Sequence, residues 1–242
     1  MRFPPRRATE TQSHGVNWVD LRVSVTPSFD CCSGRPEQGR GAWLVVIALT
    51  LASAAACSSG PSAPDDSQYV EQLTAARTFK DQHFQESPDS PVPADKRAAL
   101  LPLRYFPIDQ GYSVPAVLHL ADERPVFEMP TSSGALRKMQ LVGTIEFTLL
   151  GETRSLGAFV EDGTQQITSL FVPFADMTTG TETYVAGRYL DIDPTTTGYY
   201  TIDFNRAYNP YCAYNASYEC PFPPPTNRLK AAVRAGEKAP GA

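Results

Sequence analysis

The sequence is poor in histidine and carries no excess of positive charge, and each shortage excludes a class of site. Three histidines occur among 242 residues, and two of them, His83 and His119, follow Cys57. Because zinc sites draw mainly on cysteine and histidine at short spacings, we predict no metal site, and we expect no cofactor. From Cys57 onward the chain holds 22 acidic and 15 basic residues, a net charge of −7. We expect no nucleic-acid partner, since such proteins present a basic face.

Long hydrophobic runs are also scarce, and the one apolar run that stands out is too short to span a bilayer stably. It extends from Ala42 to Leu51 after the basic Arg40, and small residues follow it up to Cys57. A basic region, an apolar core of about ten residues and a small-residue cleavage site are typical of a secretory signal peptide. We therefore expect residues 35–56 to be a signal peptide.

The end of this segment resembles the lipobox of bacterial lipoproteins. Residues 51–56 read LASAAA and precede Cys57, the position at which lipobox cysteines are lipidated and become the new N-terminus. Ala54 stands where leucine is commonest in that pattern. The sequence predicts lipidation of Cys57 and a location in the bacterial cell envelope, outside the cytoplasm, with the membrane as a partner through the lipid. An ordinary secreted protein, or one held by an uncleaved segment, remains the alternative.

The regions on either side of this segment have different expected roles. Residues 1–34 precede the signal peptide and form either a disordered leader or a misassigned start, with translation beginning near Val23 or Val25. Residues 57–67 are small, polar and proline-containing, which predicts a flexible tether. Residues 68–238 are long enough to form a single β-rich domain.

Two helices are predicted before the strands begin. The first extends from Ser67 to Gln85, and the second from Ala94 to Leu101, where Pro102 ends it. Apolar residues recur at helical spacing along the first helix. They predict one stripe that faces the core, made of Tyr69, Val70, Leu73, Ala76 and Phe79.

From about residue 104 the apolar period changes to two, which is typical of half-buried strands. Residues 141–149 alternate cleanly, and residues 200–204 do so again. Gly151-Glu152 favours a type II′ turn, and Asp162-Gly163 favours a type I′ turn. Hairpin-spaced strands without intervening helices predict a mainly β fold, an antiparallel barrel or sandwich with the N-terminal helix packed on it.

A long irregular segment, Asp203–Leu229, dominates the C-terminal part of the sequence. It contains two cysteines, four tyrosines and five prolines, a composition that fits neither a helix nor a regular strand. Eight of the eleven tyrosines follow Thr183. Such aromatic density predicts either a loop that buries its own rings or a ligand platform. The candidate ligand-binding residues are Asn205, Tyr208, Asn209, Tyr211 and Tyr214.

Several acids and one arginine lie close to this segment in sequence. Asp176, Glu182 and Asp203, together with Arg188, could perform general acid–base chemistry if one carboxyl were desolvated. Alternatively, Arg188 bridges one of the acids and has a structural role. Both interpretations stay open.

Cys212 and Cys220 admit three interpretations. Outside the cytoplasm disulfides persist, so a local disulfide that closes a short loop is the first. A metal pair is the second, although the spacing is unusual for zinc. The third makes Cys212 a catalytic nucleophile, for which a histidine would have to be supplied by the fold.

Several motifs resemble an uncharacterised bacterial family, the one numbered sixteen eighty-four among the domains of unknown function. They read TTG and ETY, GRYLD, DFNRAYNP, CAY and CPFPPPTNRL. The resemblance covers roughly residues 73–238, with FKDQHF near the front and AGEK near the end. It implies membership only, so no functional residue is carried over.

Two function classes follow from the sequence. The first is a binding or envelope-interaction module that contacts a small-molecule or envelope ligand through the aromatic C-terminal segment. The alternative is a hydrolase-like enzyme that uses the carboxylates and the arginine beside that segment.

Overall fold

A computed structural model describes residues 66–241, all of which fall within one compact unit. The predicted leader, the signal peptide, Cys57 and nearly all of the tether lie outside the described residues. Within the described part of the chain, no helix combines the length and apolar character needed to cross a membrane.

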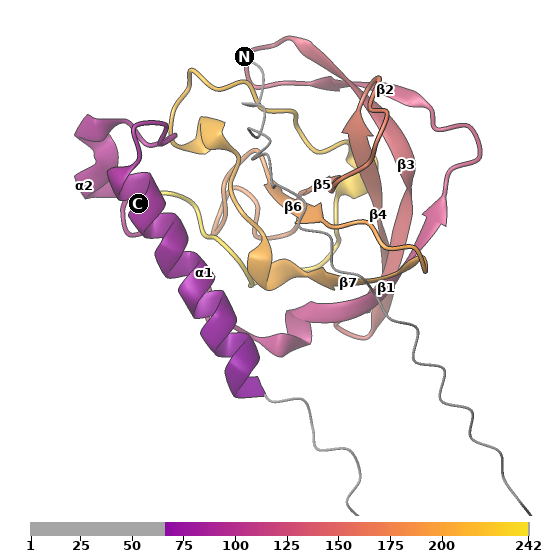
Figure 1. Cartoon of the computed structure of the whole chain (residues 1–242), viewed down its shortest axis with the longest axis horizontal. Coiled ribbons are helices and arrows are strands. Elements are labelled where there is room, and N and C mark those ends of the chain that lie inside the picture. Colours follow the sequence, from indigo (N-terminus) through magenta and orange to yellow (C-terminus); the bar gives the residue numbers. More distant parts are fainter. Residues whose placement is uncertain (1–65, 242) are drawn as a thin grey trace, which may run out of the picture. The chain divides into compact units, whose positions relative to one another are not determined.

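One antiparallel sheet of seven strands forms the body of the protein and curls into a half-barrel (Figure 1). Its order is β6-β5-β4-β3-β1-β7, and β2 pairs with β3 beside this path. The mainly β, antiparallel fold predicted from the alternating residues is confirmed. The strands are β1 (Ser113–Leu120), β2 (Val126–Pro130), β3 (Leu136–Leu149), β4 (Glu152–Glu161), β5 (Leu170–Phe174), β6 (Arg188–Ile192) and β7 (Tyr199–Asp203).

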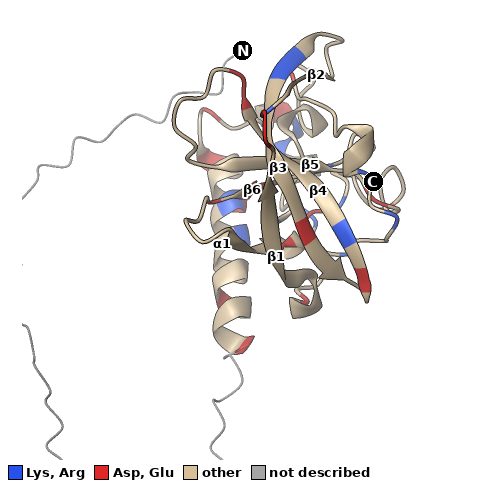
Figure 2. Ribbon diagram, turned by 90° about the vertical axis from the view of Figure 1, so that its right-hand side faces the viewer, with Lys and Arg blue, Asp and Glu red and all other residues tan. Residues whose placement is uncertain are grey.

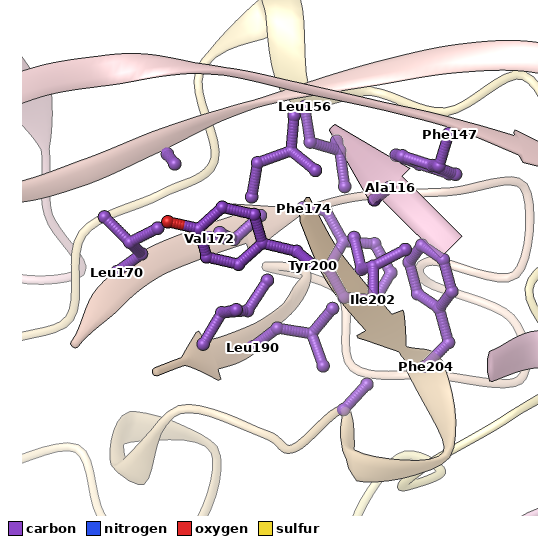
Figure 3. Close-up of a cluster of buried hydrophobic side chains, with 14 of the residues drawn as sticks. Ala116, Phe147, Leu156, Leu170, Val172, Phe174, Leu190, Tyr200, Ile202 and Phe204 are labelled. Atoms are coloured by element: carbon purple, nitrogen blue, oxygen red, sulfur yellow. The ribbon is translucent and has the colours of Figure 1, made fainter. Parts of the chain in front are cut away.

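The inner face of the curled sheet holds the main hydrophobic core (Figure 3). On β3 the side chains of Ile145, Phe147 and Leu149 are buried, while those of Glu146 and Thr148 between them are exposed. This alternation is the one expected for a strand with one solvated face. The other strands of the sheet complete the core with Ala116, Leu156, Val172, Phe174, Leu190, Tyr200 and Ile202, and Phe204 joins it directly after β7.

The β3–β4 turn lies one residue earlier than the sequence predicts. Its central residues are Leu150 and Gly151, with φ of 53° and 80°, and Leu149 pairs with Glu152 on either side. Positive φ at both central positions is the type I′ pattern, so the predicted II′ turn at Gly151-Glu152 is wrong. Glycine occupies the second central position, where it adopts the positive φ without a steric cost. Leu150 at the first position bears that cost.

The second predicted hairpin turn is also wrong. Asp162 does not have a positive φ, so the turn at Asp162-Gly163 is not type I′. Gly163 does have a positive φ of 80°, and the Thr164 N–H donates to the Glu161 carbonyl at 3.1 Å. However, β5 begins only at Leu170, so the turn opens a longer loop instead of closing a tight hairpin.

Asn227, in the irregular C-terminal segment, joins β4 to β5 where these strands pair only at Phe159 and Phe171. Its side-chain oxygen accepts from the Gly157 N–H at 2.7 Å. Its amide nitrogen donates to the carbonyls of Gly157 at 2.9 Å and Pro173 at 2.7 Å. The buried Asn227 amide therefore supplies the hydrogen bonds that a continuous strand ladder would otherwise provide.

Helix α1 (Asp66–Glu86) packs against the domain, while the short α2 (Arg97–Leu100) follows a single 3-10 turn at Ala94–Lys96. Both helices lie close to their predicted positions. Figure 1 shows α1 on the side of the domain away from β3 and β4.

The face that α1 turns toward the domain is not the predicted apolar stripe. Leu73 and Phe84 are buried, but Phe79 is 71% exposed and Val70 is 41% exposed. Ala76 is exposed as well. The stripe is wrong at these three positions because polar side chains on the other side of α1 find partners in the domain, as described next.

Candidate functional site

Asp176 and Arg188, two of the residues predicted to form a site, come together as a buried ion pair. Asp176 follows β5 and Arg188 begins β6, and the guanidinium Nη2 lies 2.7 Å from a carboxylate oxygen of Asp176. The Arg188 side chain is 1% exposed and the Asp176 side chain is 0% exposed. The other carboxylate oxygen accepts from the Thr178 N–H at 2.6 Å and the Thr178 hydroxyl at 2.5 Å. Both oxygens of Asp176 are therefore occupied.

Arg188 also organises the end of the chain. It donates to the carbonyls of Val233 at 2.8 Å, Ala235, and Glu237 at 3.2 Å. Burial lowers the pKa of Arg188, and the neighbouring Asp176 carboxylate opposes that change. A charge buried this deeply is maintained only by such partners. The geometry fits the structural interpretation of the Asp176–Arg188 pair.

The other two predicted acids are engaged elsewhere. Glu182 forms a solvent-facing pair with Arg234, with nitrogen and oxygen 2.9 Å apart, and this contact lowers the pKa of Glu182. Asp203 faces α1 and accepts from the Tyr69 hydroxyl at 2.9 Å. It also pairs with Arg206 at 3.1 Å. The four residues thus form three separate ion pairs and not one catalytic constellation.

A second buried carboxylate, Glu237, was not among the predicted site residues. Its side chain is 2% exposed and pairs with Lys80 of α1. The Tyr214 hydroxyl donates to it at 2.7 Å and the Asn209 N–H donates at 2.8 Å. The Tyr105 hydroxyl lies 3.5 Å away. We call these five residues the Glu237 centre.

The Glu237 centre is one of several polar contacts that fasten α1 to the domain. Arg77 donates to the Phe106 carbonyl at 3.0 Å, and a carboxylate oxygen of Asp81 accepts from the Leu103 N–H at 2.8 Å. Burial and the nearby Glu237 raise the pKa of Asp81. Figure 2 shows basic and acidic residues interspersed along α1. The polar contacts recur at helical spacing, on Tyr69, Arg77, Lys80 and Asp81.

A signal for Lys80 and Glu237 was present in the sequence. Lys80 belongs to FKDQHF and Glu237 to AGEK, the motifs near the two ends of the family resemblance. The structure joins them directly. Charged residues in motifs so far apart carry no local sign that they meet, because hydrophobic periodicity reports burial of apolar residues only.

The five candidate ligand-binding residues divide into two groups. Asn205, Asn209 and Tyr214 are buried and bond within the protein; the Asn205 side chain, for example, donates to the Asp109 carbonyl at 2.7 Å. Tyr208 and Tyr211 are partly exposed. Only the second group is placed where a ligand could reach it.

Tyr208 and Tyr211 form part of an aromatic surface. The rings of Tyr211 and Tyr218 meet edge to face with centroids 5.3 Å apart. The buried Phe84 ring also meets Tyr211 edge to face, with centroids 6.2 Å apart. The Tyr208 hydroxyl donates to Asp191 at 2.7 Å. Burial raises the pKa of both Tyr208 and Tyr211, so each keeps its hydroxyl proton at neutral pH. We call Tyr208, Tyr211 and Tyr218 the tyrosine surface.

Cys212 and Cys220 lie next to each other as free thiols. The Cys212 N–H donates to the Cys220 sulfur at 3.2 Å. The disulfide predicted from the sequence is not formed in this structure, and it stays a prediction for the oxidised protein. Among residues 66–241, no group of three or more histidine, cysteine and acidic side chains could hold a metal ion.

Comparisons with known proteins place the chain among uncharacterised relatives. Residues 99–238 match the family model described as "Protein of unknown function (DUF1684)". The chain is 38% identical to an uncharacterised protein from Haloarcula marismortui whose structure was determined by solution NMR. The similarity covers 72% of this chain and 96% of that protein, with a TM-score of 0.58. No curated protein matches the chain.

Proposed function

Given that the chain belongs to the DUF1684 family, we propose that it is a binding module of the bacterial cell envelope and not an enzyme. Its ligand is an envelope glycan, held on the tyrosine surface. The protein is exported by the signal peptide at residues 35–56 and anchored in the membrane through a lipid on Cys57.

The observation that carries the proposal is the contrast between the acids and the tyrosines. Asp176, Glu182 and Asp203 each have a basic partner, which leaves none of these three acids poised for proton transfer. Tyr208 and Tyr211 are instead partly exposed residues whose positions are fixed by neighbouring side chains. Rigid aromatic rings with polar tips suit a ligand that has both apolar faces and hydroxyl groups.

The hydrolase alternative would require an accessible carboxylate. Two shallow hollows lie along the outward face of α1, near Phe79 and Gln82. Glu71 lines one and Glu86 the other, but none of the predicted acids lines either hollow. Hydrolysis of an envelope substrate that is lost in Asp203→Asn but retained when Tyr211 is changed would favour the enzyme over the module.

Binding can be tested with soluble peptidoglycan fragments by calorimetry. We expect Tyr211→Ala to weaken binding about tenfold, since an aromatic anchor at the centre of a contact carries much of its energy. Tyr211→Phe should retain most of the affinity because it keeps the ring.

Tyr199→Ala is the matched control, because Tyr199 is an exposed tyrosine on β7. It should leave the affinity unchanged. Equal losses at positions 199 and 211, or no binding of the fragments by the wild-type protein, would refute the proposed surface. Thermal unfolding of each variant separates lost binding from lost folding.

The lipid anchor is tested separately. Expressed in a bacterium with its own leader, the protein should partition into the detergent phase, because an acyl anchor adds apolar area that water excludes. Cys57→Ala should abolish this partitioning, whereas Cys32→Ala, which changes a cysteine ahead of the signal peptide, should leave it intact. Equal partitioning of Cys57→Ala and wild type would show that Cys57 is not the anchor.

A further inference from the structure

The two cysteines form an asymmetric pair. Cys212 lies on the short 3-10 turn Tyr211–Ala213 and is partly exposed, whereas Cys220 is buried. The chain returns through a turn at Asn215, whose side chain accepts from the Ser217 N–H at 3.0 Å. This turn brings the Cys212 N–H within 3.2 Å of the Cys220 sulfur. Cys212 is therefore the more exposed residue of the pair, and Cys220 lies buried beside it.

Two hydrogen bonds with Ser132 hold the backbone of Cys220. Its N–H donates to the Ser132 hydroxyl at 3.1 Å, and its carbonyl accepts from the Ser132 N–H at 3.0 Å. Ser132 belongs to the hairpin between β2 and β3. The buried sulfur thus has a fixed backbone position beside the exposed one.

The surroundings of Cys212 favour its thiolate. The Tyr184 hydroxyl lies 3.8 Å from the Cys212 sulfur. Contact with the Cys220 thiol, followed by that with Tyr184, lowers the pKa of Cys212 to about 6 although burial opposes it. Contact with Cys212 and burial raise the pKa of Cys220. The pKa of Tyr184 is raised to about 12 by burial and by Cys212, so its hydroxyl keeps a proton to donate to the thiolate.

We propose that Cys212 and Cys220 form a thiol–disulfide exchange site for low-molecular-weight disulfides, with Cys212 as the attacking and Cys220 as the resolving residue. The Cys212 thiolate attacks one sulfur of the substrate disulfide, forms a mixed disulfide and releases one thiolate. The Cys220 thiol then gives its proton to solvent and attacks the Cys212 sulfur, which releases the second thiolate. The two released thiolates take up from solvent the two protons that the cysteines have given up. The substrate disulfide is reduced to two thiols and the protein pair is oxidised to one disulfide.

The site is tested with glutathione disulfide and mass spectrometry on the full-length chain with Cys31, Cys32 and Cys57 changed to Ser, which leaves Cys212 and Cys220 as its two thiols. This background serves as the wild type for the pair, and it is reduced beforehand and freed of reductant. Wild type should convert to the internal disulfide without retaining an adduct. Cys220→Ser should accumulate the mixed disulfide on Cys212. Cys212→Ser should react at least about tenfold more slowly, because its remaining thiol is buried.

The pH dependence provides a readout that does not depend on cysteine variants. Alkylation of Cys212 should be half-maximal near pH 6. At pH 6 the rate should be on the order of tenfold above that of an unperturbed cysteine, after allowance for the lower nucleophilicity of a weakly basic thiolate. Tyr184→Phe keeps the ring and removes the hydroxyl, and it should shift the profile to higher pH.

Several outcomes would overturn the proposal. One is equal reactivity of Cys212→Ser and Cys220→Ser. Another is an alkylation profile centred above pH 8 in the wild type. A pair that mild reductant cannot open would instead be a permanent structural disulfide. Retention of the wild-type profile by Tyr184→Phe would remove Tyr184 from the site.

Discussion

Arg188→Ala is expected to lower the free energy of unfolding by about 3–5 kcal/mol, because it leaves the buried carboxylate of Asp176 without its partner charge. It also leaves the carbonyls of Val233 and Ala235 without a donor, and each unsatisfied buried group adds to the loss. Denaturant unfolding of the variant and the wild type measures the difference.

Two further variants serve as controls for the loss of stability in Arg188→Ala. Arg206→Ala removes an arginine that pairs with Asp203 at the surface, where its side chain is 55% exposed, and it should cost less than about 1 kcal/mol. The double variant Arg188→Met, Asp176→Asn removes both charges, so it should be more stable than Arg188→Ala. A loss at Arg188 no larger than at Arg206 would contradict a structural role for the buried pair.

The second large effect is expected at Glu237. Glu237→Ala removes the acceptor for Lys80, the Tyr214 hydroxyl and the Asn209 N–H. We expect a loss of about 3–4 kcal/mol, since buried donors are left without partners. The amides of α1 should also exchange with solvent faster, because this helix depends on the Glu237 centre for its docking.

Glu71→Ala is the matched control, since Glu71 is an exposed carboxylate on α1. It should change stability by no more than about 0.5 kcal/mol. Lys80→Met keeps the length of the side chain and removes the charge, so a double-mutant cycle with Glu237→Gln isolates the pair. Faster exchange confined to residues around Glu237, with α1 unaffected, would show that the docking of the helix does not depend on the Glu237 centre.

The sheet could be predicted from the sequence because its signal is local. The alternation through Ile145 and Phe147 needs only neighbouring residues to be recognised, and it survives a turn placed one residue too late at Gly151. The docking face of α1 could not be predicted in this way. Val70 and Phe79 look like core residues and Lys80 like a solvated one, yet Lys80 finds a buried partner 157 residues further along the chain.

In the candidate site, too, local features could be predicted from the sequence and long-range pairings could not. The sequence placed acids and an arginine near each other but left open which would pair, because backbone geometry decides whether Asp176 or Glu182 meets Arg188. It also grouped the asparagines and tyrosines of the C-terminal segment together. Burial separates Tyr208 and Tyr211 from Asn205, and burial depends on packing against α1 and the sheet, which composition does not record.

The contacts that α1 and Arg188 make with residues near the end of the described chain have a consequence for biosynthesis. Arg188 obtains its acceptors from Val233 and Ala235, and Lys80 obtains its counter-charge from Glu237. In a nascent chain α1 therefore cannot dock until those late residues have emerged from the ribosome. Until then Arg188 also lacks its backbone acceptors. Contacts between such distant residues close last, because each requires a long loop to be ordered. For a chain that we propose to be exported, this order of contacts would favour passage through a translocation channel before the domain closes.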